Sequence, residues 1–260
     1  MGTRRGSAGD VRAPVALGDR RTGSRGRLSV GKILFVLTGA SYWTLKDGHR
    51  HPTGYWAEEF VAPYSAFVEA GHEVTVATPG AVVPTVDMMS LRPDMAGGAQ
   101  TVREEEDVIE RADELRWPIA LKDARLDDYD AVYYPGGHGP MEDLAFDADS
   151  GKLLVDALAS GKPLAVVCHA PAALLATRDA DGTSPFAGYR ITGFTNDEEE
   201  AVGLASKAKW LMEDEVKKLG VEFSRGPIWQ PYIVVDRNLY TGQNPASAGP
   251  LAKEPLKVLT

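Results

Sequence analysis

Cysteine is nearly absent from this sequence, because Cys168 is the only one in 260 residues. A single thiol excludes an intramolecular disulfide framework, and it also excludes a zinc site made of several cysteines. The fold therefore does not depend on oxidation. That property suits a reducing compartment, and we expect a cytoplasmic protein.

Long hydrophobic runs and a positive net charge are also missing. No stretch approaches the ~20 apolar residues that a membrane-spanning helix needs, so we expect no membrane partner. The net charge is −9 at pH 7, which repels nucleic acid on average, so we expect no nucleic-acid partner. Histidine is scarce, with five residues, and His49 and His51 form only a weak metal signal. We place those two at the mouth of a pocket or in solvent, and we expect neither a metal nor another cofactor.

The first 29 residues differ in composition from the rest of the chain. They hold seven arginines against only Asp10 and Asp19, they are rich in glycine and serine, and they lack the apolar core of a signal peptide. We interpret residues 1–29 as a disordered basic extension and residues 30–260 as a single domain.

Apolar and amphipathic segments alternate from residue 30 onwards. Short apolar runs predict strands at 32–38, 73–78, 130–134, 163–167, 190–194, 221–223, 233–235 and 239–241, the last two joined as a hairpin. Helices are predicted at 54–70, 150–159, 171–177, 207–219 and 245–259, with Pro63 kinking or restarting the first. This alternation indicates an α/β fold with a mainly parallel sheet and helices on both faces.

Residues 81–127 interrupt this alternation with a segment that contains several prolines and glycines. We interpret the segment as a small cap or insertion over the domain, with one helix at 107–117. Its acidic run, Glu104 to Asp107, is predicted to be a solvated face.

The sequence AVVCHAPAALL places Cys168 where a strand gives way to a helix. In a nucleophile elbow this turn is sharp, and it projects the nucleophile above the sheet. The N–H groups of the following helix favour a thiolate, so the pattern predicts a thiol pKa lowered towards neutrality. His169 follows at once, and the turn can place both side chains at the same open edge. The alternative is a buried cysteine that acts as a small hydrophobic residue.

A glycine pair follows the strand at 130–134, in the sequence YYPGGHGP. Ligands on parallel sheets bind beyond the carboxyl ends of the strands, so we expect this loop to meet Cys168. Glycine lets a loop bring its N–H groups close to developing negative charge. We predict an oxyanion hole made by the N–H groups of Gly137 and His169, with Gly136 and His138 lining the pocket. The alternative is a simple tight turn.

Four motifs, taken in order, resemble the DJ-1/PfpI superfamily and most closely its Hsp31-like (ThiJ/PfpI) branch: YYPGGHGPMEDL, AVVCHAPAALL, ITGFTNDEEE and YTGQNPASA. The resemblance covers about residues 30–259. It implies a flavodoxin-like three-layer α/β sandwich, usually homodimeric, with Cys168 as the nucleophile.

The resemblance also implies roles for two carboxylates. A glutamate of the first helix approaches the sulfur in relatives, and TGYWAEEFVAPY offers Glu58 and Glu59, of which the spacing to Pro63 favours Glu59. In relatives, an acid that follows the ITGFT strand orients the histidine. Its position in the motif corresponds to Glu199 here, or to a residue directly beside it, because Asp197, Glu198 and Glu200 are also acids. The implied catalytic set is Cys168, His169, Glu59 and Glu199.

The activity implied by the resemblance is that of a cofactor-independent cysteine enzyme on small 2-oxoaldehydes. It is glyoxalase III-like, converting methylglyoxal to lactate, and extends to protein deglycase activity; the partner is a small carbonyl substrate. Two alternatives stay open: a cysteine amidase or peptidase of the PfpI type, and a stress-response chaperone or redox sensor without catalysis. Glutaminase activity is not expected, because no partnered histidine lies near the C-terminus.

Overall fold

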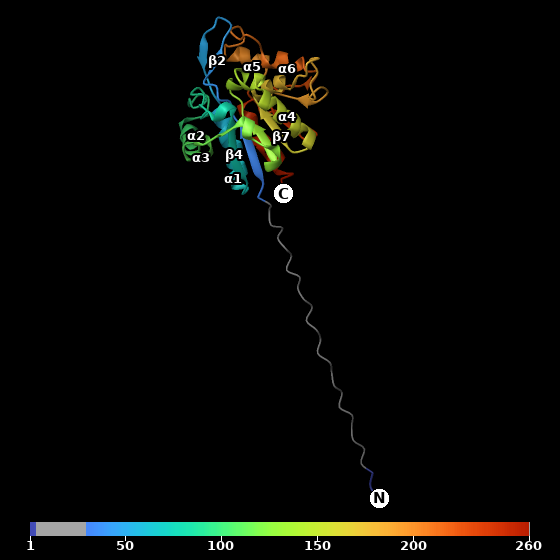
Figure 1. Cartoon of the computed structure of the whole chain (residues 1–260). Coiled ribbons are helices and arrows are strands. Elements are labelled where there is room, and N and C mark those ends of the chain that lie inside the picture. The colour runs from blue at the N-terminus through green and yellow to red at the C-terminus, as the bar shows by residue number, and fades with distance from the viewer. Residues whose placement is uncertain (4–29, 260) are drawn as a thin grey trace.

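The computed structural model describes residues 1–3 and 30–259, and its centre is a seven-stranded sheet (Figure 1). The strand order is β10-β11-β7-β6-β1-β4-β5. The strands are β1 (Lys32–Val36), β4 (Glu73–Thr78), β5 (Ile119–Ala120), β6 (Ala131–Tyr134), β7 (Leu164–Val167), β10 (Ile233–Asp236) and β11 (Leu239–Gly242). All neighbours run parallel except the β10–β11 hairpin. The predicted α/β fold with a mainly parallel sheet is therefore confirmed.

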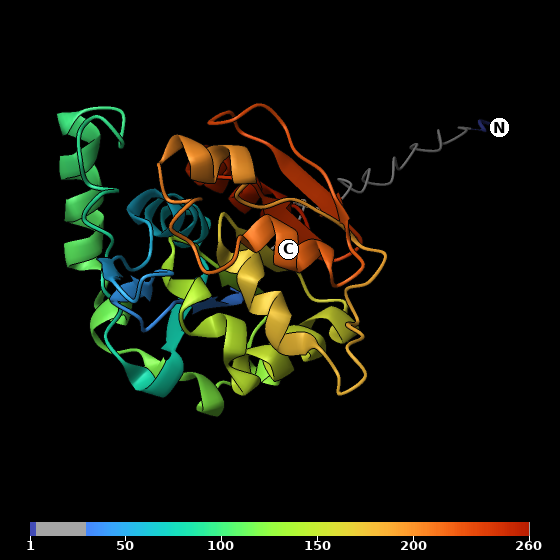
Figure 2. The ribbon, with the colours of Figure 1, turned by 90° about the horizontal axis from the view of Figure 1, so that it is seen from above.

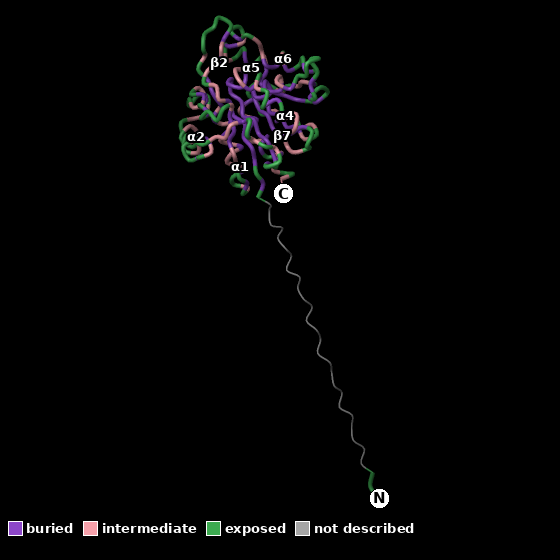
Figure 3. Tube along the Cα trace, viewed as in Figure 1, coloured by how far each residue is buried: buried purple, intermediate pink, exposed green. Residues whose placement is uncertain are grey.

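The central strands are buried along almost their whole length. All residues of β6 and β7 are buried, as are all but the first of β1 (Figure 3). Strands covered on both faces need apolar side chains at every position, which is why they appear in the sequence as continuous apolar runs.

Helices form the two outer layers (Figure 2). The helix α1 packs against α7, while α4 packs against the 3₁₀ helix η6. The α-helices are α1 (Ala57–Glu69), α2 (Ala99–Arg111), α3 (Asp113–Arg116), α4 (Ala148–Ser160), α5 (Asn196–Ala201), α6 (Met212–Lys217) and α7 (Ala248–Leu256). The 3₁₀ helices are η1 (Pro79–Ala81), η2 (Leu121–Asp123), η3 (Leu126–Asp128), η4 (Gly139–Met141), η5 (Leu144–Phe146), η6 (Ala170–Thr177) and η7 (Pro245–Ser247).

Two small sheets lie outside the central one. The strands β2 (Tyr42–Thr44) and β3 (Arg50–Pro52) form an antiparallel pair. The strands β8 (Arg190–Ile191) and β9 (Glu222–Phe223) pair in parallel. The strand predicted at 190–194 is thus shorter, and it does not join the main sheet.

Several helices differ from their predicted extents. The helix α1 continues through Pro63 without a break, so Pro63 does not restart it. The predicted helix at 207–219 is reduced to α6, and the one at 171–177 is the 3₁₀ helix η6. The closing helix begins later than residue 245, because η7 precedes α7.

The segment 81–127 contains the clearest errors of the sequence prediction. The helix expected at 107–117 has the wrong limits: α2 starts at Ala99 and ends at Arg111, and the chain leaves helical geometry at Ala112 before α3. The solvated acidic face is wrong at Glu105, which is only 4% exposed because α2 packs against α1. The segment also contributes β5, an edge strand that pairs with β4.

The predicted basic extension lies mostly outside the described residues, which omit 4–29. Among the helices that the structure describes, none has the length and apolar character needed to cross a bilayer.

Candidate active site

Cys168 follows β7 directly and occupies a strained backbone position. Its φ is +61°, a left-handed value that side-chain-bearing residues rarely adopt. Strain of this kind clusters at active sites. The residue is 2% exposed, and its Sγ lies 3.3 Å from Nδ1 of His169. The turn therefore brings two consecutive side chains together, as the elbow hypothesis requires.

Glu199 lies against His169 from the first turn of α5. Its Oε2 is 2.7 Å from His169 Nε2, and the carboxylate is buried. The helix register decides which acid of the run reaches the histidine, since Asp197 and Glu200 are exposed. The structure thus places Glu199, the residue given by the motif offset, next to His169.

Glu198 points elsewhere and is fully buried. It accepts five hydrogen bonds of 2.8–3.1 Å from the N–H and hydroxyl of Thr195, the N–H of Trp229, and the side-chain amides of Gln243 and Asn244. The network ties α5 to the loop that carries Trp229, which has a φ of +60° and lines the pocket. This carboxylate is a structural anchor rather than a partner of the histidine.

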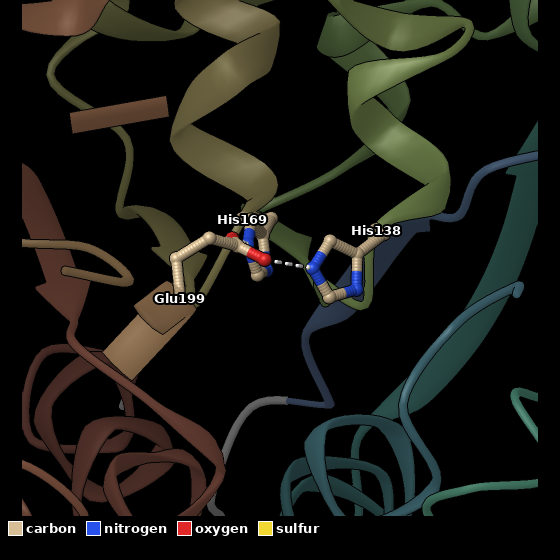
Figure 4. Close-up of side chains that lie close together, drawn as sticks. All are labelled: His138, His169 and Glu199. Atoms are coloured by element: carbon tan, nitrogen blue, oxygen red, sulfur yellow. Dashed lines mark hydrogen bonds and ion pairs between the residues drawn. The ribbon is translucent and has the colours of Figure 1, made fainter. Parts of the chain in front are cut away.

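His138 is the residue whose importance the sequence did not reveal. Its Nε2 lies 2.9 Å from Oε1 of Glu199, so one carboxylate holds two histidines (Figure 4). Its ring stacks on Trp43 of β2, with centroids 4.9 Å apart. From the sequence, His138 is predicted only to line the pocket, because nothing local links it to an acid 61 residues away.

Glu59 comes from the first turn of α1 and is fully buried. Its Oε2 accepts a hydrogen bond of 2.7 Å from the N–H of Gly136, whereas Oε1 has no partner among the described residues. Glu59 and Cys168 lie close enough for each to alter the pKa of the other. Glu58 is instead half-buried and lines an outer groove.

The glycine pair fits tightly between these groups. A Cβ at Gly136 would lie 2.7 Å from the carbonyl oxygen of Val167 and 2.8 Å from both Glu59 Oε2 and the His169 nitrogen. Gly137 has a φ of +86°, and a hydrogen bond from its N–H lowers the pKa of Cys168. The loop therefore aims an N–H at the sulfur, where the predicted oxyanion hole would lie.

Burial controls the protonation of the two groups that face the sulfur. It raises the pKa of Glu59 to about 8, so this carboxyl is protonated at pH 7. Burial, followed by the nearby His138, lowers the pKa of His169 to about 4, so its imidazole is neutral. Two neutral groups therefore flank the thiol, one able to donate a proton and the other able to accept one.

The thiol itself differs from the sequence prediction. Burial, and then the charge of Glu59 when it is ionised, raise the pKa of Cys168 well above its ordinary value, and the N–H of Gly137 only partly opposes them. The predicted lowering towards neutrality is therefore wrong. The physical reason is burial: Cys168 is almost completely shielded from water, and desolvation disfavours the charged thiolate.

Glu199 determines the tautomer of His169. Burial raises the pKa of this carboxyl, but the two histidines lower it further, and the net shift is downward. An ionised carboxylate only accepts hydrogen bonds, so each Nε2 must carry a proton and donate it. The Nδ1 of His169 is then left with a lone pair that faces the sulfur of Cys168.

A narrow apolar pocket opens above these residues. Including its mouth, it comprises about 440 Å³ not occupied by protein atoms. Its lining combines Cys168, His169, His138 and Gly137 with mainly apolar side chains, among them Trp56, Met89, Met95, Phe194 and Trp229. His51 is half-buried in this lining, while His49 is exposed. Met89 and Met95 come from the segment 81–127, which therefore covers part of the site.

Residues 53–257 match the profile of the DJ-1/PfpI family. The chain belongs to this family. Among curated DJ-1/PfpI relatives, the glutathione-independent glyoxalase HSP31 of Saccharomyces cerevisiae is 32% identical over 228 residues, 84% of this chain and 93% of that protein. The protein/nucleic acid deglycase HchA of Staphylococcus aureus is 26% identical over 227 residues, 85% of this chain and 77% of that protein.

Solved structures agree with this membership. Glyoxalase III from Candida albicans superposes with a TM-score of 0.75 at 27% identity, covering 87% of this chain and 96% of that one. Rapid Encystment Protein 24 KDa from Francisella tularensis gives 0.77 at 26% identity, covering 89% of this chain and 100% of that one. The predicted flavodoxin-like sandwich and the resemblance to the Hsp31-like branch are thus confirmed.

Proposed function

We propose that this protein is a cofactor-independent glyoxalase that converts small 2-oxoaldehydes, such as methylglyoxal, into 2-hydroxy acids. The observation that carries the proposal is that one buried sulfur lies 3.3 Å from Nδ1 of His169 and close to the buried carboxyl of Glu59, and the pKa shifts favour a neutral imidazole and a protonated carboxyl there. Relatives named as a glyoxalase and a deglycase support the choice of reaction. Deglycase activity on glycated amines would use the same groups.

The first step is addition of the sulfur to the aldehyde carbon. Because the thiol pKa is raised, the proton leaves during the attack rather than beforehand, and Nδ1 of His169 accepts it. The carbonyl oxygen becomes an oxyanion, stabilised by the N–H groups of Gly137 and His169. The proton on His169 neutralises this oxyanion, and the product is a hemithioacetal.

The second step moves a hydrogen between the two carbons. A base removes the proton from the former aldehyde carbon while the ketone oxygen gains a proton, which gives an enediol. An acid then protonates the neighbouring carbon as the hydroxyl on the first carbon loses its proton, which gives a thioester. The first carbon is oxidised and the second is reduced, so no external oxidant is needed. Water then hydrolyses the thioester, which releases lactate from methylglyoxal and restores the thiol.

Glu59 is the group best suited to this hydrogen transfer. Its Oε2 is engaged by Gly136, so the acidic proton resides on Oε1, the buried oxygen that has no partner. A pKa of about 8 leaves this carboxyl protonated at pH 7, so Glu59 enters the step as the acid that protonates the neighbouring carbon, and the neutral imidazole of His169 is the base that removes the first proton. His169 remains the alternative source of the proton.

The shape of the pocket favours small substrates over extended chains. Two tryptophans and two methionines, Trp56, Trp229, Met89 and Met95, narrow the approach to the sulfur. A peptide bond in a folded chain would need a wider channel, which weighs against the amidase or peptidase alternative. We also propose a homodimer, as the family resemblance implies, and a cytoplasmic location, which suits a chain with a single cysteine.

Lactate formation from methylglyoxal without glutathione tests the proposal. Wild type should produce lactate, whereas Cys168→Ala and Cys168→Ser should reduce the rate to background. Equal rates in wild type and Cys168→Ala would refute the mechanism. Suppression of aggregation that persists in Cys168→Ala, together with no lactate from wild type, would favour a chaperone.

A further inference from the structure

We propose that His138, His169 and Glu199 form a binding site for a transition-metal cation, with zinc as the best-fitting ion, and that binding switches the active site off. Each residue offers one ligand atom, and these atoms all lie within 4.8 Å of one another. Figure 4 shows the three side chains converging from separate segments of the chain. Two imidazoles and one carboxylate are ligands that Zn²⁺ accepts in catalytic sites.

The geometry requires little rearrangement. The carboxylate oxygens of Glu199 lie 2.9 Å from Nε2 of His138 and 2.7 Å from Nε2 of His169. Tetrahedral zinc with bonds of about 2.0–2.1 Å separates its ligands by about 3.3 Å. The two contacts between Glu199 and the imidazoles therefore need to lengthen by only about half an ångström, and one ligand atom from each of the three residues already lies within 4.8 Å of the others. The pocket reaches both histidines, so a hydrated ion has a route to the site.

The surroundings provide the support that metal-bound histidines usually have. The second ring nitrogen of such histidines usually donates a hydrogen bond, which fixes the orientation of the ring. The Nδ1 of His169 faces the sulfur of Cys168, and the His138 ring stacks on Trp43. Three protein ligands leave the fourth position of the ion for water.

Inhibition follows from the tautomer. A zinc ion takes the lone pair of Nε2 in His169, so the single ring proton must move to Nδ1. That nitrogen then donates to the sulfur and no longer accepts its proton. The imidazole can no longer act as the base for the attack, and Glu199 no longer holds it in the reactive tautomer. The inhibitory consequence rests on the proposed function, whereas metal binding itself does not.

The site excludes Cys168 as a ligand, and this distinguishes it from an ordinary zinc–thiolate site. The sulfur contacts Nδ1 of His169, on the opposite side of the ring from the Nε2 that would hold the ion. Metal affinity should therefore survive the loss of the thiol. It should depend on His138, which a zinc–thiolate site at Cys168 and His169 would not use.

Titration calorimetry with ZnCl₂ on the full chain tests the site independently of turnover. We expect one Zn²⁺ per chain in wild type, unchanged affinity in Cys168→Ser and in the surface control His49→Asn, and affinity at least about tenfold weaker in His138→Asn and Glu199→Gln. No binding by wild type, loss of binding in Cys168→Ser, or unchanged binding in His138→Asn would each overturn the proposal.

The absorption spectrum of bound Co²⁺ tests the ligand set in the wild-type protein, so this test does not depend on the folding of any variant. Co²⁺ bound to nitrogen and oxygen ligands shows visible d–d bands without a near-ultraviolet sulfur-to-cobalt charge-transfer band. We expect that spectrum from wild type. A charge-transfer band would show that the sulfur binds the ion and would refute the assignment, even if the Glu199 variant proved unstable.

Discussion

The Sγ atom of Cys168 lies 3.3 Å from Nδ1 of His169, although the two residues are consecutive in the chain. Consecutive side chains normally diverge, and here the left-handed φ of Cys168 turns them towards each other. The elbow brings nucleophile and base together, and Glu199 holds the ring of His169 from its other nitrogen. What the elbow does not set is the tautomer of the base.

The tautomer depends on Glu199, and Glu199→Gln tests this dependence. A glutamine offers one acceptor and one donor, so it cannot accept from both histidines. We expect kcat for methylglyoxal to fall by up to about 10⁴-fold, the loss seen when the acid of a catalytic triad is replaced by its amide. Steady-state lactate assays measure the effect. Glu200→Gln, at an exposed neighbouring position, should match wild type; an equal loss there would point to a general disturbance of α5.

The protonation of Glu59 should appear in the pH profile of kcat/KM. The acid is active when protonated, so activity should be lost as pH rises through the folded pKa of about 8. On the acidic side, protonation of His169 should remove the base as pH falls through about 4. Initial rates across this range should give a bell-shaped curve with a plateau between these values.

Glu59→Gln is the variant that assigns the alkaline limb. It keeps an acceptor for the N–H of Gly136 but carries no titratable proton. We expect the limb near pH 8 to disappear and kcat to fall by roughly 10²–10⁴-fold. Glu58→Gln serves as the matched control on the same helix turn. Retention of full kcat by Glu59→Gln would transfer the hydrogen-transfer step to His169.

Glu198 should control stability and the shape of the pocket rather than chemistry. Glu198→Ala leaves five buried or half-buried donors without their acceptor and should lower the free energy of unfolding by about 3–5 kcal/mol. Urea denaturation measures the loss. Because the Trp229 loop is freed, KM should rise more than kcat falls. A change of less than 1 kcal/mol (about the effect of a surface substitution) would show that the network is dispensable.

Gly136 should tolerate no side chain. An alanine there would place its Cβ within 2.8 Å of atoms of Val167, Glu59 and His169, two of them in the backbone. We expect Gly136→Ala to destabilise the protein by about 1–3 kcal/mol and to abolish activity, because Glu59 and Cys168 must separate. Gly249→Ala, at a position with open space, is the control. Thermal melts of both variants measure the change in stability, and lactate assays measure the change in activity.

Much of the fold could be read from local patterns. The strand at 73–78 matches β4 residue for residue, because a run rich in valine and threonine ends at Pro79-Gly80. The glycine pair and the strand-to-helix turn at Cys168 were likewise visible, since each reflects a backbone requirement that only a few residue types meet. The acid-rich helix α2 was misplaced, because its limits follow from packing against α1 rather than from its own composition.

The sequence by itself determined the parallel sheet, the elbow and the short list of residues able to carry the chemistry. Tertiary structure alone decided how these residues behave. It joined His138 to Glu199 across 61 positions, directed Glu198 away from the histidines, and buried the thiol deeply enough to raise its pKa rather than lower it. Protonation depends on desolvation and on the charges of neighbours, and both are properties of position in the folded chain.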